Sequence, residues 1–336
     1  MATPFEVLEI AGREVRITNP GKVFFPARGI TKLDLARYYV DVMPGALTGC
    51  RHRPTTMYRW PNGVDAPDDA FYQKRVPPHR PEWIQTTTIH FPSGRSAEMP
   101  VVADGAHILW MVNLGCLDVN PWPVRRADVD HPDELRLDLD PTPEIPFDDV
   151  RAVALELNDV LGEYGLTGWP KSSGKRGIHV LVRVEPRWPF TEIRRAALAL
   201  ARAVERRTPK ATTAWWKEER VGVFIDYNQN ARDRTVASAY SVRPTPDARV
   251  SCPITWDEIE DFDPAELRLE TVPERFARLG DPHAGIDEHP GSLEAALELA
   301  HRDESEGLGD APWPPHFPKA PGEPVRAQPS KRRRDA

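Results

Sequence analysis

Three short segments in the middle of the chain alternate between apolar and polar residues. Residues 135–140 read Leu-Arg-Leu-Asp-Leu-Asp, and residues 178–184 and 221–226 follow the same period of two. This period is typical of a β-strand with one buried face. We therefore predict strands at these three places, with Val221 pointing inward at the start of the third.

Two longer segments repeat every three to four residues, as amphipathic helices do. Asp148 can cap the first helix and Gly165 can end it, and the second is predicted at residues 191–207. The apolar stripe of the first helix consists of Val150, Val153, Ala154, Leu157, Val160, Leu161 and Tyr164. The order of elements predicts an RRM-like split βαβ sheet in an α/β (α+β) protein.

The N-terminal part is predicted to be β-rich and irregular. Residues 5–17 alternate as one strand would, and Thr31 and Asp34 form a capping box for a helix. The buried stripe of that helix consists of Leu35, Tyr38, Tyr39 and Val42. Residues 51–126 are rich in proline, tryptophan and short β-type runs.

The chain is predicted to fall into four parts. These are an N-terminal β-rich subdomain (1–130), a catalytic metal- and nucleotide-binding core (131–256), an acidic helical segment (257–310) and a Pro-rich basic tail (311–336). In the third part, Leu293, Leu297 and His301 share one candidate helix face. The tail carries seven prolines and the run Ser330-Lys-Arg-Arg-Arg334, a composition that does not favour a packed core.

Charge is distributed unevenly within the net charge of −7. Residues 257–310 carry 17 acidic and 4 basic side chains, a net charge of −13, whereas residues 1–256 carry 34 basic and 32 acidic side chains, a net charge of +2. Phosphate binding draws its affinity from Lys and Arg. The first 256 residues are therefore compatible with a nucleic-acid groove.

Cysteines and hydropathy exclude several classes of protein. Cys50, Cys116 and Cys252 stand apart without CxxC or histidine pairing, so we expect buried free thiols rather than a disulfide or a zinc site. No apolar run approaches the ~18 residues of a membrane span, and the first residues lack a signal-peptide pattern. We expect a cytoplasmic, nucleoid-associated protein with no membrane partner.

Three aspartates are the candidate catalytic residues. Asp138 and Asp140 lie two residues apart on the first predicted strand, opposite its leucines, and the same parity places Asp226 with them. Three carboxylates suit two Mg²⁺ or Mn²⁺ ions ~3.5–4 Å apart, which can activate a hydroxyl and stabilise a leaving pyrophosphate. An Asp-x-Asp alone is a weak signal, because it also occurs in sugar-nucleotide transferases, nucleases and solvated strand faces.

A glycine-rich basic loop at residues 171–179 leads directly into the second strand. It offers backbone amides, a hydroxyl and two charges to an anion such as a triphosphate. These come from Ser173, Gly174, Lys175, Arg176 and Gly177. The spacing is not that of a Walker A loop, and an ordinary hairpin with solvated cations is the alternative. His179 should face the carboxylates.

Further donors follow the third strand and lie in the N-terminal half. Gln229, Arg232, Arg234 and Arg243 come after Asp226. The N-terminal half mixes cations with aromatics, as grooves that bind single strands do. These are Lys22, Lys32, Arg59, Trp60, Phe71, Tyr72, Lys74 and Arg75. Taken one at a time, each is more often structural.

Together these motifs resemble the bacterial primase-polymerases of the archaeo-eukaryotic primase superfamily. The polymerase domain of the bacterial end-joining ligase, ligase D, and its stand-alone actinobacterial relatives match best. The resemblance covers most of residues 5–280. Its motifs, in family order, are Thr18-Asn-Pro-Gly-Lys22, Arg59-Trp-Pro-Asn-Gly-Val64, Leu137-Asp-Leu-Asp-Pro141, Ser172-Ser-Gly-Lys-Arg-Gly-Ile-His179 and Phe224-Ile-Asp-Tyr-Asn-Gln-Asn230.

The resemblance implies a template-dependent DNA/RNA primase-polymerase, a nucleotidyltransferase with two Mn²⁺ (or Mg²⁺) ions at Asp138, Asp140 and Asp226. It implies NTP and dNTP substrates, with ribonucleotides preferred. Nucleotide contacts would come from Ser173, Gly174, Lys175, Arg176, His179, Gln229 and Arg243. DNA contacts would come from Lys22 and Lys32, which hold a 5′-phosphate, together with Arg59 and the template-stacking Phe71.

The same resemblance implies gap filling, end extension or priming on gapped, recessed or broken DNA ends. The pathway would be non-homologous end joining or excision repair, alongside Ku and a separate DNA ligase. Many relatives carry a histidine shortly after the strand predicted around Trp110, where this chain has Asn120 or Trp122. Metal affinity or phosphate contact there is expected to differ, with His107 as a candidate substitute.

Two other functions remain open from the sequence. A metal-dependent nuclease would share the carboxylates, but it needs no triphosphate loop such as residues 173–179. A non-catalytic DNA-binding adaptor that recruits Ku or ligase would have no reason to keep three repelling acids.

Overall fold

The computed structural model describes residues 3–314 and residue 317. The basic run at 330–334 and most of the predicted tail lie outside the described residues. The helices are α1 (Lys32–Asp41), α2 (Met43–Cys50), α3 (Gly105–Asn113), α4 (Phe147–Glu163), α5 (Phe190–Arg207), α6 (Val272–Leu279) and α7 (Glu294–Ser305).

Most of the strands are short. In the first half they are β1 (Phe5–Ile10), β2 (Arg13–Thr18), β3 (Val23–Phe25), β4 (Ile30–Thr31), β5 (Thr55–Arg59), β6 (Phe71–Gln73), β7 (Thr86–His90), β8 (Ser96–Pro100) and β9 (Cys116–Pro121). In the second half they are β10 (Glu134–Pro141), β11 (Gly168–Ser172), β12 (Ile178–Arg183), β13 (Ala211–Thr212), β14 (Val223–Asp226), β15 (Ser241–Val242) and β16 (Val250–Ser251). A 3-10 turn, η4 (Tyr227–Asn230), follows β14 directly.

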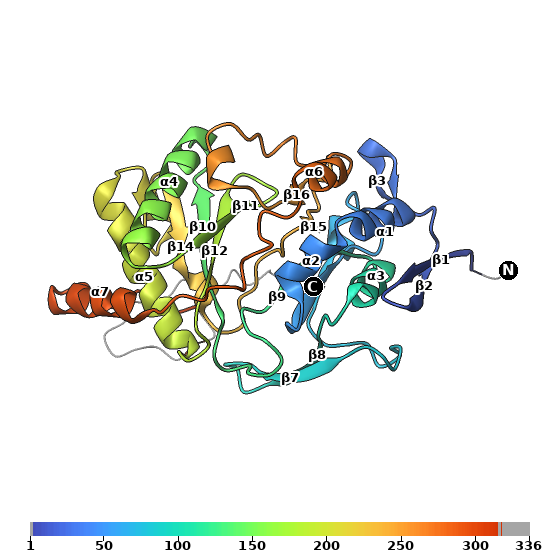
Figure 1. Cartoon of the computed structure of the whole chain (residues 1–336), viewed down its shortest axis with the longest axis horizontal. Helices are drawn as coiled ribbons and strands as arrows, with labels where there is room; N and C mark the ends of the chain where they lie inside the picture. Colours follow the sequence, from blue (N-terminus) through green and yellow to red (C-terminus); the bar gives the residue numbers. More distant parts are fainter. Residues whose placement is uncertain (1–2, 315–316, 318–336) are drawn as a thin grey trace, which may run out of the picture.

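A five-stranded sheet forms the centre of the second half, in the order β11-β12-β10-β14-β13. β10 pairs antiparallel with both β12 and β14, and β13 adds a parallel edge strand. The helices α4 and α5 pack on one side of this sheet, and the N-terminal half lies on the other side (Figure 1). The predicted RRM-like split βαβ order in a mixed α/β protein is therefore confirmed.

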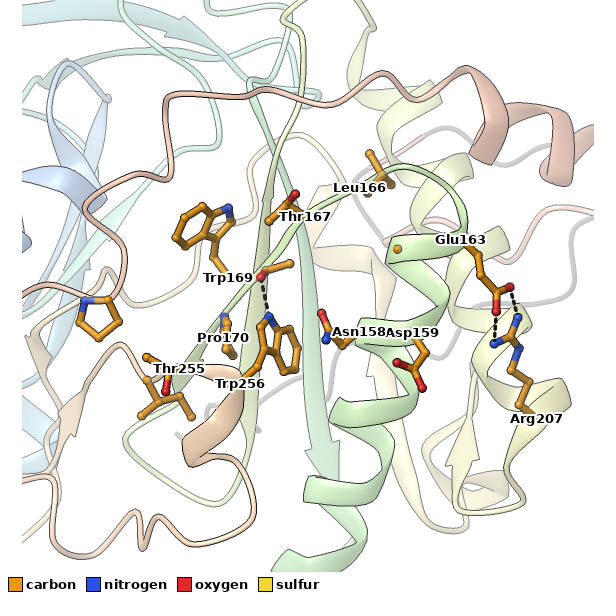
Figure 2. Close-up of a pocket in the computed structure, with 14 residues that line it drawn as sticks. Asn158, Asp159, Glu163, Leu166, Thr167, Trp169, Pro170, Arg207, Thr255 and Trp256 are labelled. Atoms are coloured by element: carbon orange, nitrogen blue, oxygen red, sulfur yellow. Dashed lines mark hydrogen bonds and ion pairs between the residues drawn. The ribbon is translucent and has the colours of Figure 1, made fainter.

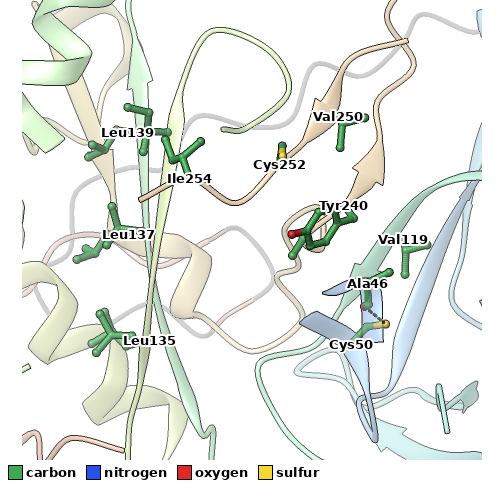
Figure 3. Close-up of a cluster of buried hydrophobic side chains, with 14 of the residues drawn as sticks. Ala46, Cys50, Val119, Leu135, Leu137, Leu139, Tyr240, Val250, Cys252 and Ile254 are labelled. Atoms are coloured by element: carbon green, nitrogen blue, oxygen red, sulfur yellow. Dashed lines mark hydrogen bonds between the residues drawn. The ribbon is translucent and has the colours of Figure 1, made fainter. Parts of the chain in front are cut away.

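The alternation along β10 explains why the sheet has one apolar and one polar face. Leu135, Leu137 and Leu139 have no exposed surface and belong to the main core (Figure 3). Arg136 points the other way, and its Nη2 donates to the carbonyl of Pro121, on β9 of the N-terminal half, at 3.0 Å. Polar side chains of β10 are thus directed toward the space between the two halves.

The N-terminal half contains the three-stranded sheet β6-β5-β9, three hairpins and helices α1 to α3. The Thr31–Asp34 capping box of α1 is present, as predicted. Residues 5–17 form a hairpin rather than one strand, because Ala11 and Gly12 take positive φ angles between β1 and β2. The predicted strand around Trp110 is also wrong, since that residue lies in α3.

Three further local predictions are corrected. Asp148 does not cap α4: Pro146 is the N-cap, and Asp148 lies in the first turn paired with Arg151. Val221 is 75% exposed, because β14 begins only at Val223. His301 is exposed, and the buried residues of α7 are Ala296, Leu299, Ala300 and Asp303.

The acidic segment packs against the catalytic half through α7, which lies along α5 (Figure 1). Arg195 Nε of α5 is 2.8 Å from Glu304 Oε1, and Arg206 Nη1 is 3.0 Å from Asp303 Oδ1. Part of the local negative charge is therefore neutralised within the molecule.

An ion network joins the two halves and the C-terminal segment. Arg53 Nη1, without exposed surface, lies 2.6 Å from Asp133 Oδ1, and Arg183 Nε lies 2.6 Å from Asp287 Oδ1. Burial alone would raise the pKa of Asp133, but Arg53, Arg183 and Arg125 together hold it well below its usual range. Removing one partner would leave a buried charge uncompensated.

Two predictions about the chain as a whole can be compared with the structure. Cys50, Cys116 and Cys252 are free and buried, as predicted. Among residues 3–314, none of the helices combines the length and the apolarity needed to cross a membrane.

Candidate active site

A row of four polar residues crosses the sheet, because each is the direct strand partner of the next. Asp138 on β10 pairs with Asp226 on β14 and with His179 on β12, and His179 pairs with Lys171 on β11. Side chains of directly opposed residues point to the same face, with Cβ atoms about 4.5–5.5 Å apart. Asp140 lies two residues beyond Asp138 on that face. The strand register thus brings the three aspartates and His179 together.

The carboxylates are held under mutual repulsion. Burial, followed by the charges of Asp140 and Asp226, raises the pKa of Asp138 well above its ordinary value. Burial and Asp226 likewise raise the pKa of Asp140. Asp138 Oδ1 is buried without a hydrogen-bond partner. Carboxylates placed in this way need a compensating cation or proton.

His179 does not supply that compensation. Its Nε2 lies 3.3 Å from Asp138 Oδ1, but burial and then Lys171 and Arg243 lower its pKa well below the ordinary value. The imidazole is therefore neutral near pH 7. A divalent cation fits this donor set, because its oxygen-rich carboxylates suit hard metal ions. Among the described residues, no group of three or more His, Cys, Asp or Glu side chains is arranged in this conformation so that it could hold a metal ion.

Lys171 orients His179, a role that the sequence did not suggest. Its Nζ, fully buried, lies 2.7 Å from His179 Nδ1 and 2.5 Å from Ser251 Oγ. Donation from Nζ to Nδ1 leaves the imidazole proton on Nε2, toward Asp138. The signal in the sequence was the strand parity of Lys171 with Ser173, but recognising it required the pairing with β12.

The glycine-rich loop is the turn of the β11–β12 hairpin and lies against β10. A Cβ on Gly177 would come within 2.3 Å of the carbonyl oxygen of Leu139, and one on Gly174, whose φ is +70°, would come within 2.3 Å of Arg243 Cγ. Both glycines are therefore required by close approach within the protein. Ser173 Oγ accepts from the amides of Lys175 and Gly177, at 3.2 and 3.0 Å.

The predicted nucleotide-contacting residues are not all directed to one place. Gln229 Nε2 donates to Asp226 Oδ2 at 2.8 Å. Arg243 Nη1 lies 2.6 Å from Asp118 Oδ2 on β9, which ties the catalytic face to the N-terminal half. Arg176 instead turns toward the loop after β10, where its Nη2 donates to the carbonyl of Pro143 at 2.8 Å.

Arg220 is a second functional candidate that the sequence did not single out. Its guanidinium carbon lies 3.4 Å from the centroid of the Phe224 ring. Burial lowers the pKa of Arg220, and the negative charges of Asp226 and Asp140 oppose that lowering. It approaches these aspartates from the segment before β14. The sequence gives no periodic signal for it, because it precedes the strand by an irregular turn.

The four predicted DNA contacts gather in the N-terminal half. Lys32 Nζ donates to the carbonyl of Thr18 at 2.8 Å and to Asn113 Oδ1 at 3.0 Å. Burial, then Lys22 and Arg59, lower the pKa of Lys32 to about 8. Arg59 also lies over the ring of Phe71, 5.1 Å from its centroid. This arrangement concentrates positive charge beside an exposed aromatic ring.

Tyr72 follows Phe71 on β6, points to the opposite face of the strand, and forms an aromatic pair there. The rings of Tyr58 and Tyr72 are stacked with centroids 4.1 Å apart. Phe71 is 43% exposed and Tyr72 is 59% exposed. Exposed rings next to cations are suited to stacking on unpaired bases.

The residues at the position of the expected histidine have different environments. Asn120 is buried on β9 and donates to the carbonyl of Asp118 at 2.9 Å. Trp122 packs against Phe91 and Phe190 in a separate apolar cluster. His107 lies in α3 and bonds Asp104 Oδ1 at 2.9 Å, so it is part of the helix cap rather than a substitute at the carboxylates.

A cavity of about 910 Å³ is lined by none of these residues. Trp169, Trp256 and the ion pair of Arg207 with Glu163 form its walls beside α4 (Figure 2). Lys175 and Arg176 are among the residues that line a smaller cavity of about 290 Å³. Strand register and charge both support the carboxylate row, and we assign the candidate site to it. The size of the other cavities does not outweigh these two observations.

The chain resembles known proteins over most of its length. A family model described as LigD, primase-polymerase domain, matches residues 31–283. The multifunctional non-homologous end joining protein LigD of Mycolicibacterium smegmatis is 32% identical over 281 residues, which cover 81% of this chain and 36% of that protein. The bifunctional non-homologous end joining protein LigD of Bacillus subtilis is 27% identical, and the match covers 82% of this chain and 45% of that protein.

These curated relatives are much longer than the chain, which spans less than half of their length. A solved structure agrees over a single domain. The polymerase domain from Mycobacterium tuberculosis ligase D, in complex with DNA, is 31% identical with a TM-score of 0.76, and the match covers 82% of this chain and 98% of that one. The chain belongs to the LigD primase-polymerase domain family, whose polymerase domain is a nucleotidyltransferase-type enzyme.

Proposed function

We propose that the chain is a template-dependent DNA/RNA primase-polymerase that adds nucleotides to the 3′ end of a DNA strand. The observation that carries the proposal is the strand register that aligns Asp138 with Asp226 and His179. The hairpin turn at 173–177 adjoins this row, since Gly177 approaches Leu139 between the two β10 aspartates. Family membership supports the same chemistry.

Asp138, Asp140 and Asp226 would hold two divalent metal ions. When bound, such ions favour ionisation of the attacking 3′-hydroxyl and stabilise the leaving pyrophosphate. We propose Mn²⁺ as the preferred ion, with Mg²⁺ as the alternative. The raised pKa values of Asp138 and Asp140 support metal binding, because a cation would relieve the repulsion that causes them.

The incoming nucleotide would lie beside the hairpin turn and Arg243, which pack against each other. Ser173, Gly174 and Lys175 offer a hydroxyl, an amide and a charge to its phosphates, and His179 offers the Nε2 proton that Lys171 orients. Gln229 would act beside Asp226. Arg176 would reach the phosphates only after leaving the carbonyls of the loop at 142–145. We propose a preference for ribonucleotides on family grounds.

The DNA substrate would be a gapped, recessed or broken end with a 5′-phosphate. Lys22 and Lys32 would hold that phosphate, and Arg59 would add charge. These hydrogen bonds of the three cations all go to uncharged acceptors, so their positive charge is available to a phosphate. Phe71 would stack on the template. The setting would be end joining or excision repair with Ku and a separate ligase, in the cytoplasm and at the nucleoid.

Primer extension on a gapped duplex tests this function. The wild type should extend the primer with Mn²⁺, more strongly with ribonucleotides than with deoxyribonucleotides, and more strongly beside a 5′-phosphate than a 5′-hydroxyl. Asp138→Ala and Asp226→Ala should reduce extension below detection, because each removes a proposed metal ligand. Asp159→Asn, on the exposed surface of α4, is the matched control and should extend normally.

Two results would contradict the proposal. Shortening of the strand without added nucleotides would favour a metal-dependent nuclease. Binding of gapped DNA without incorporation under any metal would favour the non-catalytic adaptor of an end-joining complex.

A further inference from the structure

A short segment after α7 returns to the catalytic half and covers a buried arginine. We call residues 310–313 the C-terminal strap. Arg194, on α5, has no exposed surface. Its guanidinium lies between the rings of Trp313 and Tyr227, 4.2 and 5.2 Å from their centroids. The strap is thus the outer wall of the site that holds this charge.

The guanidinium uses both the strap and η4 as partners. Nη1 lies 2.7 Å from Asp310 Oδ1, and Nη2 donates to the carbonyls of Ala311 and Pro312 at 3.1 and 2.8 Å. Nε and Nη2 also donate to Asn228 Oδ1, at 3.1 and 3.0 Å. Trp313 Nε1 donates to the second oxygen of Asp310 at 2.8 Å, which fixes the carboxylate.

Asn228 connects this cluster to the carboxylate row. Its backbone amide donates to Asp226 Oδ1 at 2.9 Å, and the neighbouring Gln229 occupies Oδ2. Asp226 is thereby held as the N-cap of η4. A continuous series of hydrogen bonds therefore runs from the strap through Arg194 and Asn228 to the third aspartate.

We propose that Arg194 and the C-terminal strap are positioning elements that set the orientation of Asp226 for metal binding. The proposal rests on the proposed function, in which Asp226 is a metal ligand. The strap lies beyond residue 283, where the match to the family model ends. A segment outside that match would thus tune the affinity of the catalytic centre for its ion.

The electrostatics explain why the strap has this effect. Asp310 is the carboxylate that pairs with Arg194. Without the strap, a buried guanidinium would lose its counter-ion and two carbonyl acceptors, which is strongly unfavourable. Arg194 would then move toward water and release Asn228. The planar fork of Arg can serve all these acceptors at once, whereas the ammonium of Lys cannot.

Two variants and a matched control test the proposal in the full chain. Arg194→Lys keeps the charge but loses the fork, and Trp313→Ala removes the ring over the guanidinium while changing only a partly exposed residue. Arg202→Lys is the control, because Arg202 anchors the preceding residues through the carbonyls of Leu308 and Gly309, and neither of these hydrogen bonds involves η4.

The readouts are Mn²⁺ binding, followed by electron paramagnetic resonance of the free ion, and the Mn²⁺ dependence of primer extension. Arg194→Lys and Trp313→Ala should weaken Mn²⁺ binding roughly tenfold, as loss of residues that orient ligands does. Their kcat at saturating Mn²⁺ and their affinity for gapped DNA should remain near those of the wild type. Arg202→Lys should bind Mn²⁺ as the wild type does.

The outcomes separate the two proposals. If the wild type extends primers and Trp313→Ala, shown to be folded by its thermal unfolding transition, binds Mn²⁺ with unchanged affinity, the positioning role is overturned and the proposed function stands. Equal weakening by Arg202→Lys would also overturn it, since the effect would then be a general loosening of the C-terminal segment. A wild type that neither binds Mn²⁺ nor extends primers would overturn the proposed function itself.

Discussion

At the scale of single residues, Lys32 shows how the proposed phosphate site is prepared for an anion. Its hydrogen-bond acceptors, the Thr18 carbonyl and Asn113 Oδ1, are uncharged. Burial, followed by the charges of Lys22 and Arg59, lowers its pKa to about 8. A bound phosphate would supply the missing negative charge and raise that pKa. Binding of a phosphate would therefore relieve the repulsion among Lys22, Lys32 and Arg59.

This arrangement predicts a pH-dependent preference for a 5′-phosphate. Lys32 is charged below its pKa of about 8, so the preference should be complete near pH 7 and should decline as pH rises through 8 toward 9. The decline should be up to roughly tenfold, since one pKa unit corresponds to a factor of ten. Fluorescence anisotropy with 5′-phosphorylated and 5′-hydroxyl gapped DNA measures the ratio of the two affinities.

Arg is charged throughout this range, which makes Lys32→Arg the control. The variant should show a preference that does not change between pH 7 and 9. The same decline in the variant and in the wild type would show that another group titrates.

Residue types that carry chemistry could be recognised in the sequence, but their partners could not. The parity of Asp138, Asp140 and Asp226 indicated one shared face, and their strand pairing agrees with it. The roles of Lys171 and Arg220 could not be predicted, because the residues that they contact in the structure belong to other strands. Side-chain direction beyond a strand, as for Arg176, depends on acceptors such as Pro143 that no local pattern reveals.

At the scale of elements, the β11–β12 hairpin has little room for change. Gly177→Ala would place a methyl group 2.3 Å from the Leu139 carbonyl oxygen, a backbone atom that cannot move freely. We expect a loss of stability of about 1–3 kcal/mol, typical of overpacking, and a reduced rate of primer extension because the turn is displaced from β10. Chemical unfolding and extension kinetics would measure the two effects.

Gly162 in α4 offers a matched substitution in open space, because, apart from its chain neighbours and the backbone of its own helix, no atom of the described residues lies within 4 Å of the place that an added methyl group would take. Gly162→Ala should stabilise the protein by up to about 1 kcal/mol, because alanine favours the helix, and should leave extension unchanged. If both alanine variants behaved alike, close packing of the hairpin would not be the cause.

Elements with a clear polar–apolar period were predicted well, and the almost uniformly apolar helix α3 was not. Residues 135–140 alternate and form β10, while α3 is buried on almost all sides and therefore shows no amphipathic stripe around Trp110. The hairpin within residues 5–17 turns at Ala11, which is not a typical turn residue. Periodicity reports a difference between two faces, so it fails where that difference is absent.

At the scale of the whole molecule, His283 links the C-terminal segment to the catalytic sheet. The residue is buried, and its Nε2 donates to the carbonyl of Pro170 on β11 at 2.9 Å. Burial lowers its pKa to about 4. The folded protein therefore keeps the ring neutral at a pH where the unfolded chain would bind a proton.

The contribution of His283 to stability should consequently fall in mild acid. Because the folded pKa of His283 lies below the unfolded value, its contribution is complete above about pH 6.5 and is lost as pH falls toward 4. The loss should be roughly 3 kcal/mol. Urea unfolding between pH 7 and 4 would measure it, and His283→Gln should give a shallower dependence. An unchanged slope in that variant would assign the acid sensitivity to other groups.

Contacts between distant parts of the chain were the least predictable. Arg194 and Asp310 are 116 residues apart, and neither stands out by composition or period. Whether the acidic segment packs on the core was open from the sequence alone, and the ion pairs of α7 with α5 answer this. Such pairs depend on the final arrangement of helices rather than on local preference.

Strand pairing alone aligns four residues of the candidate site, Asp138, Asp226, His179 and Lys171. This dependence determines which insertions and deletions related proteins can tolerate. Adding one residue within β14 would move Asp226 to the leucine side of the sheet, since each step along a strand reverses the side-chain direction. Length changes in the connection between β13 and β14 would leave the alignment intact. Natural variation in chain length should therefore accumulate in the connections and avoid the paired strands.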